Sequence, residues 1–262
     1  MRTAPVKSAA RVIEVLELFR ADARPHSLKE LSHKLDYPQS SATVLMKSLM
    51  SLGYLNYDPG RRVYFPTLRV TGLGDWIPKA LFGHGEIFEI MRDVHSACGE
   101  CVAIAVQNDV YVQYIKVIQS SHALSFHIEE GSMRVVTRSA AGWMLLSMKS
   151  DSEVDRLVRR ANIATSSSDE RFNTADFVRM MPRIRREKYA YSENIPLLGA
   201  ATFCVPLPVK LQGQPVVLGL GGLLARLRPQ RAKMVGLLQK SAAAISALVE
   251  NGAPVFDRTP HP

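Results

Sequence analysis

The sequence predicts an α+β protein in two unequal parts, and three observations lead to this fold class. The chain has 262 residues, of which 47% are hydrophobic, so it can bury a sizeable core and fill more than one domain. Its first quarter contains three short segments with helical periodicity, followed by a β-hairpin pattern. Beyond about residue 85, apolar strands are interspersed with amphipathic helices, without an internal repeat.

Two amphipathic helices open the chain. The first begins near Ser8, and its apolar residues recur at the spacing of one helix face: Val12, Val15, Leu16 and Phe19. We expect Ser27 to cap the second helix, because Glu30 stands three residues later and completes a capping box. The second helix should end by Tyr37, since Pro38 disfavours helical geometry in the residue before it.

A third helix with two unlike faces is predicted from Pro38 onward by the stretch PQSSATVLMKSLMSLGYL. Its inward face carries apolar side chains: Ala42, Leu45, Leu49 and Leu52. Its outward face carries small hydroxyl residues, a valine and one lysine: Ser40, Ser41, Thr43, Val44, Lys47 and Ser48. Gly53 follows as the C-cap. Such an outward face suits the close approach of something large and anionic.

A β-hairpin follows the third helix directly. The segments YLNYD and RVYFP flank a PGR turn, which places Arg61 and Arg62 near the tip. Two helices, a turn, a third helix and a hairpin, in this order, are the elements of a winged helix-turn-helix. The sequence therefore predicts a DNA-binding domain in its first quarter.

In a winged helix-turn-helix the third helix enters the major groove, so its outward face is the expected DNA contact. Small side chains let the backbone approach base edges, and Lys47 would neutralise a phosphate or contact guanine. Arg61 and Arg62 would meet the DNA backbone or the adjacent minor groove. The alternative for each residue is an ordinary solvated surface, and the order of the elements favours DNA binding.

The positive charge of the chain is concentrated in the same region. The formal net charge is +9, and residues 1–72 hold eleven Lys and Arg against six Asp and Glu. A basic excess at one end indicates an anionic partner there. The opening residues lack the uninterrupted apolar core of a signal peptide, and the run PVVLGLGGLLA is too short to span a bilayer. We therefore expect a cytoplasmic protein without membrane contact.

The cysteines do not indicate a disulfide framework, because there are only three in a chain of this length. Cys98 and Cys101 form the motif CGEC, with His95 just before it. A zinc site would need a second pair of ligands, which is missing, and Cys101 begins the strand-like segment CVAIAVQ instead of a helix. We expect structural cysteines and no metal or other cofactor.

The second part of the chain begins after a glycine-interrupted helical stretch near residues 72–84. A helix over FEIMRDVHSA is followed by three predicted strands: ECVAIAVQ, VYVQYIKVI and HALSFHI. Later helices are predicted over the ranges 139–148, 152–160 and 229–249. A further helical segment carries Pro182, which predicts a kink or a break. The strands ATFCVPLPV and PVVLGLGGLL precede the final helix.

The sequence does not indicate a catalytic site. Ser125, His127 and Glu129 alternate along one predicted strand, but no nucleophile elbow or zinc-binding helix motif accompanies them. The glycine-rich GLGGLL at Gly219 lacks the lysine and the spacing of a phosphate loop. We therefore expect no enzyme activity, and an enzyme acting on a small acid is the less favoured alternative.

Several motifs in the same order resemble the IclR (isocitrate lyase regulator) family of bacterial transcription regulators. They are SAARVIEVLELF and LKELSHKLDYPQSSATVLMKSLMSLGYL, followed by EEGSMRVVTRSAAGWMLLS, RIRREKYAYSEN and VVLGLGGLLARLRPQR. The resemblance covers about residues 8–250 in register. It implies a winged-helix domain over residues 1–71, a linker helix over 72–84, a GAF-like effector-binding domain over 85–252 and a flexible tail over 253–262.

The same resemblance implies the partners of the protein. Family members assemble as homodimers or dimers of dimers on palindromic operators in double-stranded DNA, and they typically respond to small organic acids, often metabolic or aromatic carboxylates. Position by position, the effector pocket of the family corresponds here to Ser139, Ala140, Gly142, Asn194, Cys204, Gly219 and Gly221.

This chain departs from the family pattern near the expected pocket. Gly219 and Gly221 stand where serines are usual, Trp143 stands where a lysine is common, and Val135 replaces a proline. A pocket that loses two hydroxyls and gains an indole should be larger and less polar, which favours a bulkier or aromatic ligand over a compact keto acid. The alternative is a constitutive DNA-binding regulator whose second domain serves only oligomerisation.

Overall fold

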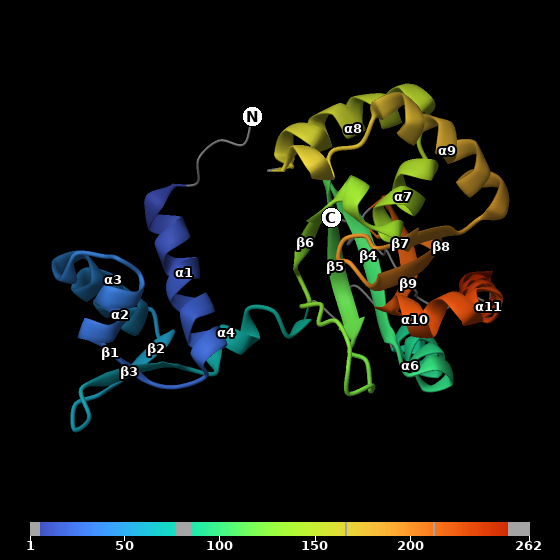
Figure 1. Ribbon diagram of the computed structural model, residues 1–262. Helices are drawn as coiled ribbons and strands as arrows, with labels where there is room; N and C mark the ends of the chain where they lie inside the picture. The colour runs from blue at the N-terminus through green and yellow to red at the C-terminus, as the bar shows by residue number, and fades with distance from the viewer. Residues whose placement is uncertain (1–5, 77–84, 166, 212, 251–262) are drawn as a thin grey trace. The chain divides into compact units, whose positions relative to one another are not determined.

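The computed structural model describes residues 6–76, 85–165, 167–211 and 213–250. The chain divides into two compact units, Met1–Pro78 and Lys79–Pro262, each with its own hydrophobic core. Residues 77–84, which are most of the expected linker helix, and the expected tail over 253–262 lie outside the described residues. The predicted α+β fold class, with an N-terminal helix-turn-helix unit, is confirmed (Figure 1).

The N-terminal unit combines helices with a small sheet. The helices are α1 (Lys7–Asp22), α2 (Leu28–Lys34), α3 (Gln39–Ser51) and the short α4 (Arg69–Gly72). The antiparallel sheet has the order β1-β3-β2, with β1 (His26–Ser27), β2 (Leu55–Asp58) and β3 (Val63–Pro66). The predicted hairpin is therefore confirmed, and β1 adds an edge strand that the sequence did not predict.

The predicted capping box begins α2. The backbone N–H of Ser27 donates to Glu30 Oε2 at 2.8 Å, and the backbone N–H of Glu30 donates to Ser27 Oγ at 3.3 Å. These two bonds satisfy donors that a helix start leaves without partners inside the helix. The helix ends at Lys34, before the limit that Pro38 imposes.

One inward residue of α3 was predicted wrongly. Ala42 and Leu49 are buried as expected, but Met46 is the buried residue between them, at 1% exposure, whereas Leu52 is 57% exposed. Leu52 is the C-cap of α3, and Gly53 follows in the left-handed region at φ 78°. Glycine accepts this conformation without a steric cost, so the chain turns toward β2 before Leu52 can face the core.

His26 is fully buried between α1 and α2. Its Nε2 lies 3.0 Å from Asp22 Oδ2, and its Nδ1 lies 3.9 Å from Glu30 Oε2. The ring packs against the core residue Phe19, with 5.4 Å between the ring centroids. Burial, together with the positive charge of Arg24, lowers the pKa of His26 below its usual value of 6.5, although the two carboxylates act in the opposite direction.

The C-terminal unit is a six-stranded antiparallel sheet between two layers of helices (Figure 1). The strands, in the order β6-β5-β4-β9-β8-β7, are β6 (Met133–Val135), β5 (Tyr111–Ile118), β4 (Cys101–Asn108), β9 (Gln214–Leu223), β8 (Ala200–Leu211) and β7 (Ala190–Glu193). Helix α7 (Ala140–Ser147) packs on one face together with α8 (Asp151–Ala164) and α9 (Thr174–Glu187). Helices α6 (Glu86–Cys98), α10 (Leu224–Leu227) and α11 (Arg231–Glu250) pack on the other face.

Alternation along the strands separates the two faces. Cys101 and Ala103 of β4 belong to the core under α7, whereas Val102 and Ile104 belong to the core against α6 and α11. The sheet is therefore buried on both faces. Among the helices of the described residues, none is long and apolar enough to cross a membrane.

One predicted strand in this unit was wrong. HALSFHI forms no strand and belongs to an irregular segment over residues 119–132, and the strand next to β5 is the later β6. Of the kink or break expected at Pro182, the break is absent: α9 continues from Thr174 to Glu187, and its buried residues hold the helix in the core: Phe177, Met181 and Ile184. The strand β7 was not predicted.

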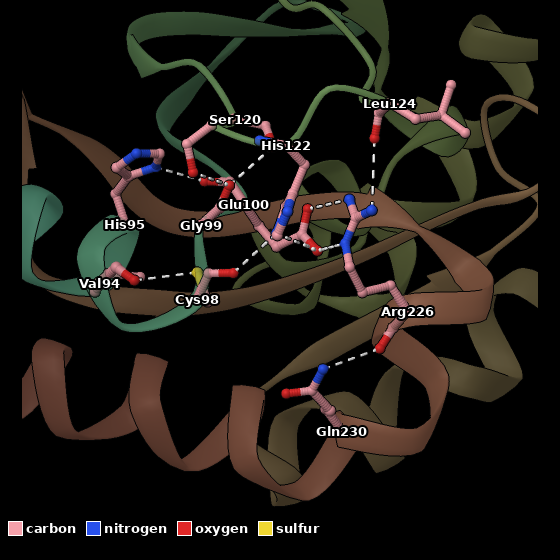
Figure 2. A network of polar contacts seen from close by, with 11 residues as sticks. Val94, His95, Cys98, Gly99, Glu100, Ser120, His122, Leu124, Arg226 and Gln230 are labelled. Atoms are coloured by element: carbon pink, nitrogen blue, oxygen red, sulfur yellow. Dashed lines mark hydrogen bonds and ion pairs between the residues drawn. The ribbon is translucent and has the colours of Figure 1, made fainter.

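An ion pair with a buried carboxylate lies at one end of the central strands. The Glu100 carboxylate is 1% exposed and accepts two bonds from the Arg226 guanidinium, one of them 2.8 Å long from Nη2 (Figure 2). His122 Nε2 lies 3.7 Å from the same carboxylate. A Cβ atom at Gly222 would lie 2.1 Å from Glu100 Oε2, so the carboxylate fills the space that a side chain there would need.

Burial of His26 predicts that the N-terminal unit loses stability in mild acid. Because the folded state lowers the pKa of His26, the unfolded chain takes up the proton more readily, and stability should fall as the pH drops below about 6.5. Hydrogen exchange followed by mass spectrometry should show less protection of α1 to α3 at pH 5.5 than at pH 7.5, after correction for intrinsic rates. His26→Phe should remove most of this difference, and His33→Gln, on the exposed side of α2, should keep it. Equal protection at both pH values in the unchanged protein would contradict this prediction.

The contact at Gly222 predicts a stability defect in the C-terminal unit. Gly222→Ala would force a methyl group against the Glu100 carboxylate and disturb its pairing with Arg226, so it should lower the free energy of unfolding by about 1–3 kcal/mol, as overpacked cores do. Gly236→Ala in α11 is the matched control, because nothing lies within 4 Å of its added Cβ. Thermal unfolding of both variants tests this prediction, which fails if Gly222→Ala is as stable as the control.

Candidate functional site

The outer face of α3 (Ser40, Ser41, Thr43, Val44, Lys47 and Ser48) is the first candidate site. Val44 is 66% exposed, and Lys47 makes no hydrogen bond or ion pair with the described residues. The Thr43 hydroxyl donates to the carbonyl of Gln39 at 2.7 Å, and that of Ser48 donates to the carbonyl of Val44 at 2.9 Å. The hydroxyl groups of Thr43 and Ser48 are thus held close to the helix, and Lys47 is the cation of this face.

The tip of the β2–β3 hairpin presents two more cations. Asp58 Oδ1 accepts hydrogen bonds from the backbone N–H groups of Gly60 at 2.9 Å and Arg61 at 3.1 Å, which fixes the turn. Arg62 follows at φ 56°, and the side chains of Arg61 and Arg62 are exposed. The structure therefore holds both arginines on a defined turn of the same compact unit as α3.

A cavity of about 70 Å³ in the C-terminal unit is the second candidate site. It lies on the α7 face of the sheet, where the facing residues of the central strands are small. Ala103 stands opposite Gly219, and Cys101 stands opposite Gly221, in the β4–β9 pair. Because a facing pair of such residues leaves space that larger side chains would fill, the cavity follows from the composition of these two strands.

The cavity includes three of the residues that the family resemblance indicated: Ser139, Gly219 and Gly221. The Ser139 side chain caps α7 by accepting from the backbone N–H of Gly142 at 3.0 Å. An added Cβ would lie 3.0 Å from the Phe203 carbonyl oxygen at Gly219 and 3.0 Å from Thr202 Cγ2 at Gly221, so a side chain at either position would require its neighbours to shift slightly.

The other four residues that the family resemblance indicated do not line the cavity. Ala140 is fully buried, and an added Cβ at Gly142 would lie 1.8 Å from the Val136 carbonyl oxygen, so this glycine lets α7 pack closely. Cys204 lies next to Gly219 on the neighbouring strand. Asn194 Oδ1 accepts from the backbone N–H of Gly199 at 2.9 Å and thereby shapes the loop between β7 and β8. These residues support the cavity without lining it.

Sequence reasoning missed several residues that line the cavity, because they come from segments far apart in the chain. Polar groups come from β5, β6 and β8: Tyr114, Arg134 and Thr202. The irregular segment 119–132 contributes Phe126, His127 and Ile128, and the β7–β8 loop contributes Pro196 and Leu197. The alternation of β5 was a usable signal for Tyr114, whereas nothing local marked the residues of the irregular segment.

The expectation that Trp143 shapes the pocket was wrong. The indole Nε1 donates to the Thr137 carbonyl at 2.7 Å, and the ring packs edge-on against Phe172 and Phe177. Trp143 therefore belongs to the core between α7 and α9, because its hydrogen-bond acceptor and its aromatic neighbours lie there and not at the cavity.

The cavity walls are mostly uncharged. Burial raises the pKa of the Cys101 thiol to about 12, so the thiol stays protonated and contributes an apolar surface. Burial also raises the pKa of Tyr114, while the charge of Arg134 and a hydrogen bond with Ser139 act in the opposite direction. Within the described residues, no group of three or more His, Cys, Asp or Glu could hold a metal ion.

The segment over residues 119–132 is fastened at both ends. The Ser120 hydroxyl donates to the Gly99 carbonyl at 2.8 Å, and Arg226 Nη1 reaches the Leu124 carbonyl at 3.5 Å (Figure 2). At its other end, the backbone N–H of Tyr114 donates to the Ser132 carbonyl at 3.0 Å, and inside the segment Gln119 Nε2 donates to the Ile128 carbonyl at 2.6 Å. The ion pair of Glu100 and Arg226 thus holds a wall of the cavity as well as the end of the sheet.

Comparison with known proteins identifies both units. Residues 8–59 match the family model described as the IclR helix-turn-helix domain, and residues 86–247 match that of the bacterial transcriptional regulator IclR C-terminal domain. The HTH-type transcriptional regulator KdgR of Escherichia coli (strain K12) is 22% identical over 248 residues, which cover 92% of this chain and 92% of KdgR.

Solved structures support the same assignment of both units. The effector domain of a transcriptional regulator, IclR, from Acinetobacter sp. ADP1 is 42% identical and superposes with a TM-score of 0.59, covering 61% of this chain and 93% of that domain. An IclR homolog from Microbacterium hydrocarbonoxydans, complexed with 4-hydroxybenzoate, is 18% identical with a TM-score of 0.69 and covers 93% of this chain and 99% of its own. The chain therefore belongs to the IclR family of bacterial transcriptional regulators, and it is a DNA-binding transcription factor and not an enzyme.

Proposed function

We propose that this regulator is a ligand-controlled switch. Paired N-terminal units read a palindromic operator, and the cavity of each C-terminal unit binds a small organic acid, of which an aromatic carboxylate is the favoured class. Ligand control requires that the acid bind with different affinity to the operator-bound and the free arrangement of the protein.

For the DNA half of the proposal, the reading surface is the outer face of α3. Its small hydroxyl residues permit close approach to base edges, and Lys47 is free to contact guanine or a phosphate. Arg61 and Arg62, on the fixed turn of the hairpin, would contact the flanking backbone or minor groove. A palindromic site requires a second copy of the chain, and the N-terminal unit exposes apolar side chains that suit such an interface: Ile13, Leu68 and Trp76.

The cavity under α7 is the single observation that carries the effector half. A concave site with apolar walls and a few polar groups is typical of small-molecule binding. Its volume of about 70 Å³ favours a small acid over the bulkier ligand that a lining indole would have suggested. A structural relative was solved with 4-hydroxybenzoate, so this single-ring acid is the first ligand to test.

The role of Lys47 is tested with an operator selected from a random DNA library by the full-length protein. Lys47→Ala should weaken operator binding by about 1–3 kcal/mol if the ammonium reads a base, and it should leave random DNA almost unaffected. If Lys47 instead neutralises a phosphate, both DNAs should lose affinity alike, and the slope of log K against log salt should fall by about 0.9. Fluorescence anisotropy at two salt concentrations separates these cases.

Lys240→Ala, at an exposed position on α11, is the matched control for the loss of one positive charge. It should bind the selected operator as the unchanged protein does. Equal operator affinity of the Lys47 and Lys240 variants would remove α3 from the proposed reading surface.

The effector half predicts that an acid stabilises the protein and changes operator binding. At 100 times its dissociation constant a ligand should add about 2.7 kcal/mol of stability, which a thermal shift assay with 4-hydroxybenzoate and a panel of aliphatic acids would detect. Ala103→Met, which fills the cavity, should abolish the shift and keep DNA binding, because Ala103 lies in the C-terminal unit. If no acid raises the unfolding temperature of the unchanged protein, the alternative holds, in which the C-terminal unit serves only oligomerisation and the regulator is constitutive.

A further inference from the structure

Arg134 is the residue of the cavity whose charge lacks a counterpart. It lies on β6 opposite Val112 of β5, so it shares the face of the sheet that packs under α7. It is half-buried, and it forms no hydrogen bond or ion pair with the described residues. Other arginines of this unit do have carboxylate partners, such as Arg138 with Glu170 at 3.1 Å and Arg226 with Glu100.

An unpaired, partly desolvated guanidinium in a cavity favours an anion as the missing partner. Removing a charge from water is costly unless an opposite charge or hydrogen-bond acceptors compensate. A guanidinium matches the geometry of a carboxylate, to which it can donate two parallel hydrogen bonds. The neighbouring groups are compatible with an anion there, since Tyr114 and Ser139 supply hydroxyl groups and no lining residue is an Asp or Glu.

The remainder of the cavity indicates how many carboxylates the ligand carries. Beyond β5 the lining passes over the small residues of β4 and β9 to Thr202 of β8, whose hydroxyl is already hydrogen-bonded to that of Ser192 at 2.6 Å. The other lining residue able to carry positive charge, His127, is exposed on the irregular segment. A second carboxylate at the far end would therefore meet no unpaired cation among the lining residues.

We infer that Arg134 binds the carboxylate of the effector, so that the cavity selects monocarboxylates whose uncharged end lies toward Thr202. This inference rests on the proposed function, because it assumes that the cavity is the effector site. It adds which residue holds the acid group, which way the ligand lies, and which acids are rejected.

Isothermal titration calorimetry on the full-length protein tests the inference with three related probes: 4-hydroxybenzoate, its uncharged amide 4-hydroxybenzamide, and the dicarboxylate terephthalate. The unchanged protein should bind the acid at least about tenfold more tightly than the amide, since hydrogen bonds to charged groups are the stronger ones. Terephthalate should bind at least about tenfold more weakly than 4-hydroxybenzoate, because its second carboxylate would be unpaired.

Arg134→Gln should remove the preference for the acid while leaving amide binding within about threefold, and Arg134→Lys should restore part of the preference because it keeps the charge without the bidentate geometry. Arg156→Gln, an exposed position on α8, is the matched control and should behave as the unchanged protein does. This pattern would separate a contact with the ligand charge from a structural role, which would weaken acid and amide alike.

Different outcomes would overturn the role of Arg134 and the effector function of the cavity. If the unchanged protein binds acid and amide equally, if Arg134→Gln keeps the preference, or if terephthalate binds as tightly as 4-hydroxybenzoate, the inference about Arg134 is overturned while the effector cavity stands. If the unchanged protein binds none of these probes and none of the aliphatic acids, although operator binding is intact, the proposed effector function fails and the inference falls with it.

Discussion

The cavity, and with it any ligand control of this regulator, depends on one packing constraint. The central strands of the C-terminal sheet must carry very small residues on the face that α7 covers, and Ala103, Gly219 and Gly221 meet that requirement. On the helix side, Gly142 lets α7 pack against the backbone at Val136. The cavity needs both the close packing of α7 and the small residues on the strands. Larger side chains on the strands would fill the interior as densely as the rest of the core and leave no cavity.

The ion pair of the buried Glu100 with the partly exposed Arg226 connects this cavity to the rest of the unit. Glu100 occupies the space beside Gly222, and Arg226 reaches on to the Leu124 carbonyl, so one carboxylate secures a strand end and the irregular segment together. A buried charge is tolerated only when it is paired, and the geometry here satisfies that condition fully for Glu100. Arg134, by contrast, has no such partner among the described residues, and this difference distinguishes an arginine that holds the fold from one that suits a ligand.

In the N-terminal unit, by contrast, contacts between residues close in sequence determine where most helices and turns begin and end. The capping box at Ser27 begins α2, Gly53 ends α3 in the left-handed region, and Asp58 fixes the hairpin turn that presents the arginines. Each device involves residues a few positions apart. The outer face of α3 and the wing depend mainly on these local contacts, which is why short stretches of the amino-acid sequence suffice to predict them.

The sequence by itself therefore determined the α+β class, the order of elements in the helix-turn-helix unit, and the family to which the chain is similar, because periodicity, capping and turn chemistry act over short distances. Only the tertiary structure decided that Met46 and not Leu52 faces the core, that HALSFHI is irregular, and that α9 continues through Pro182, since burial against distant segments outweighs local preference. The cavity is the extreme case. Three of its residues were indicated by resemblance, but Arg134 reaches it through the pairing of β6 with β5, and no local sequence pattern encodes which distant strands will pair.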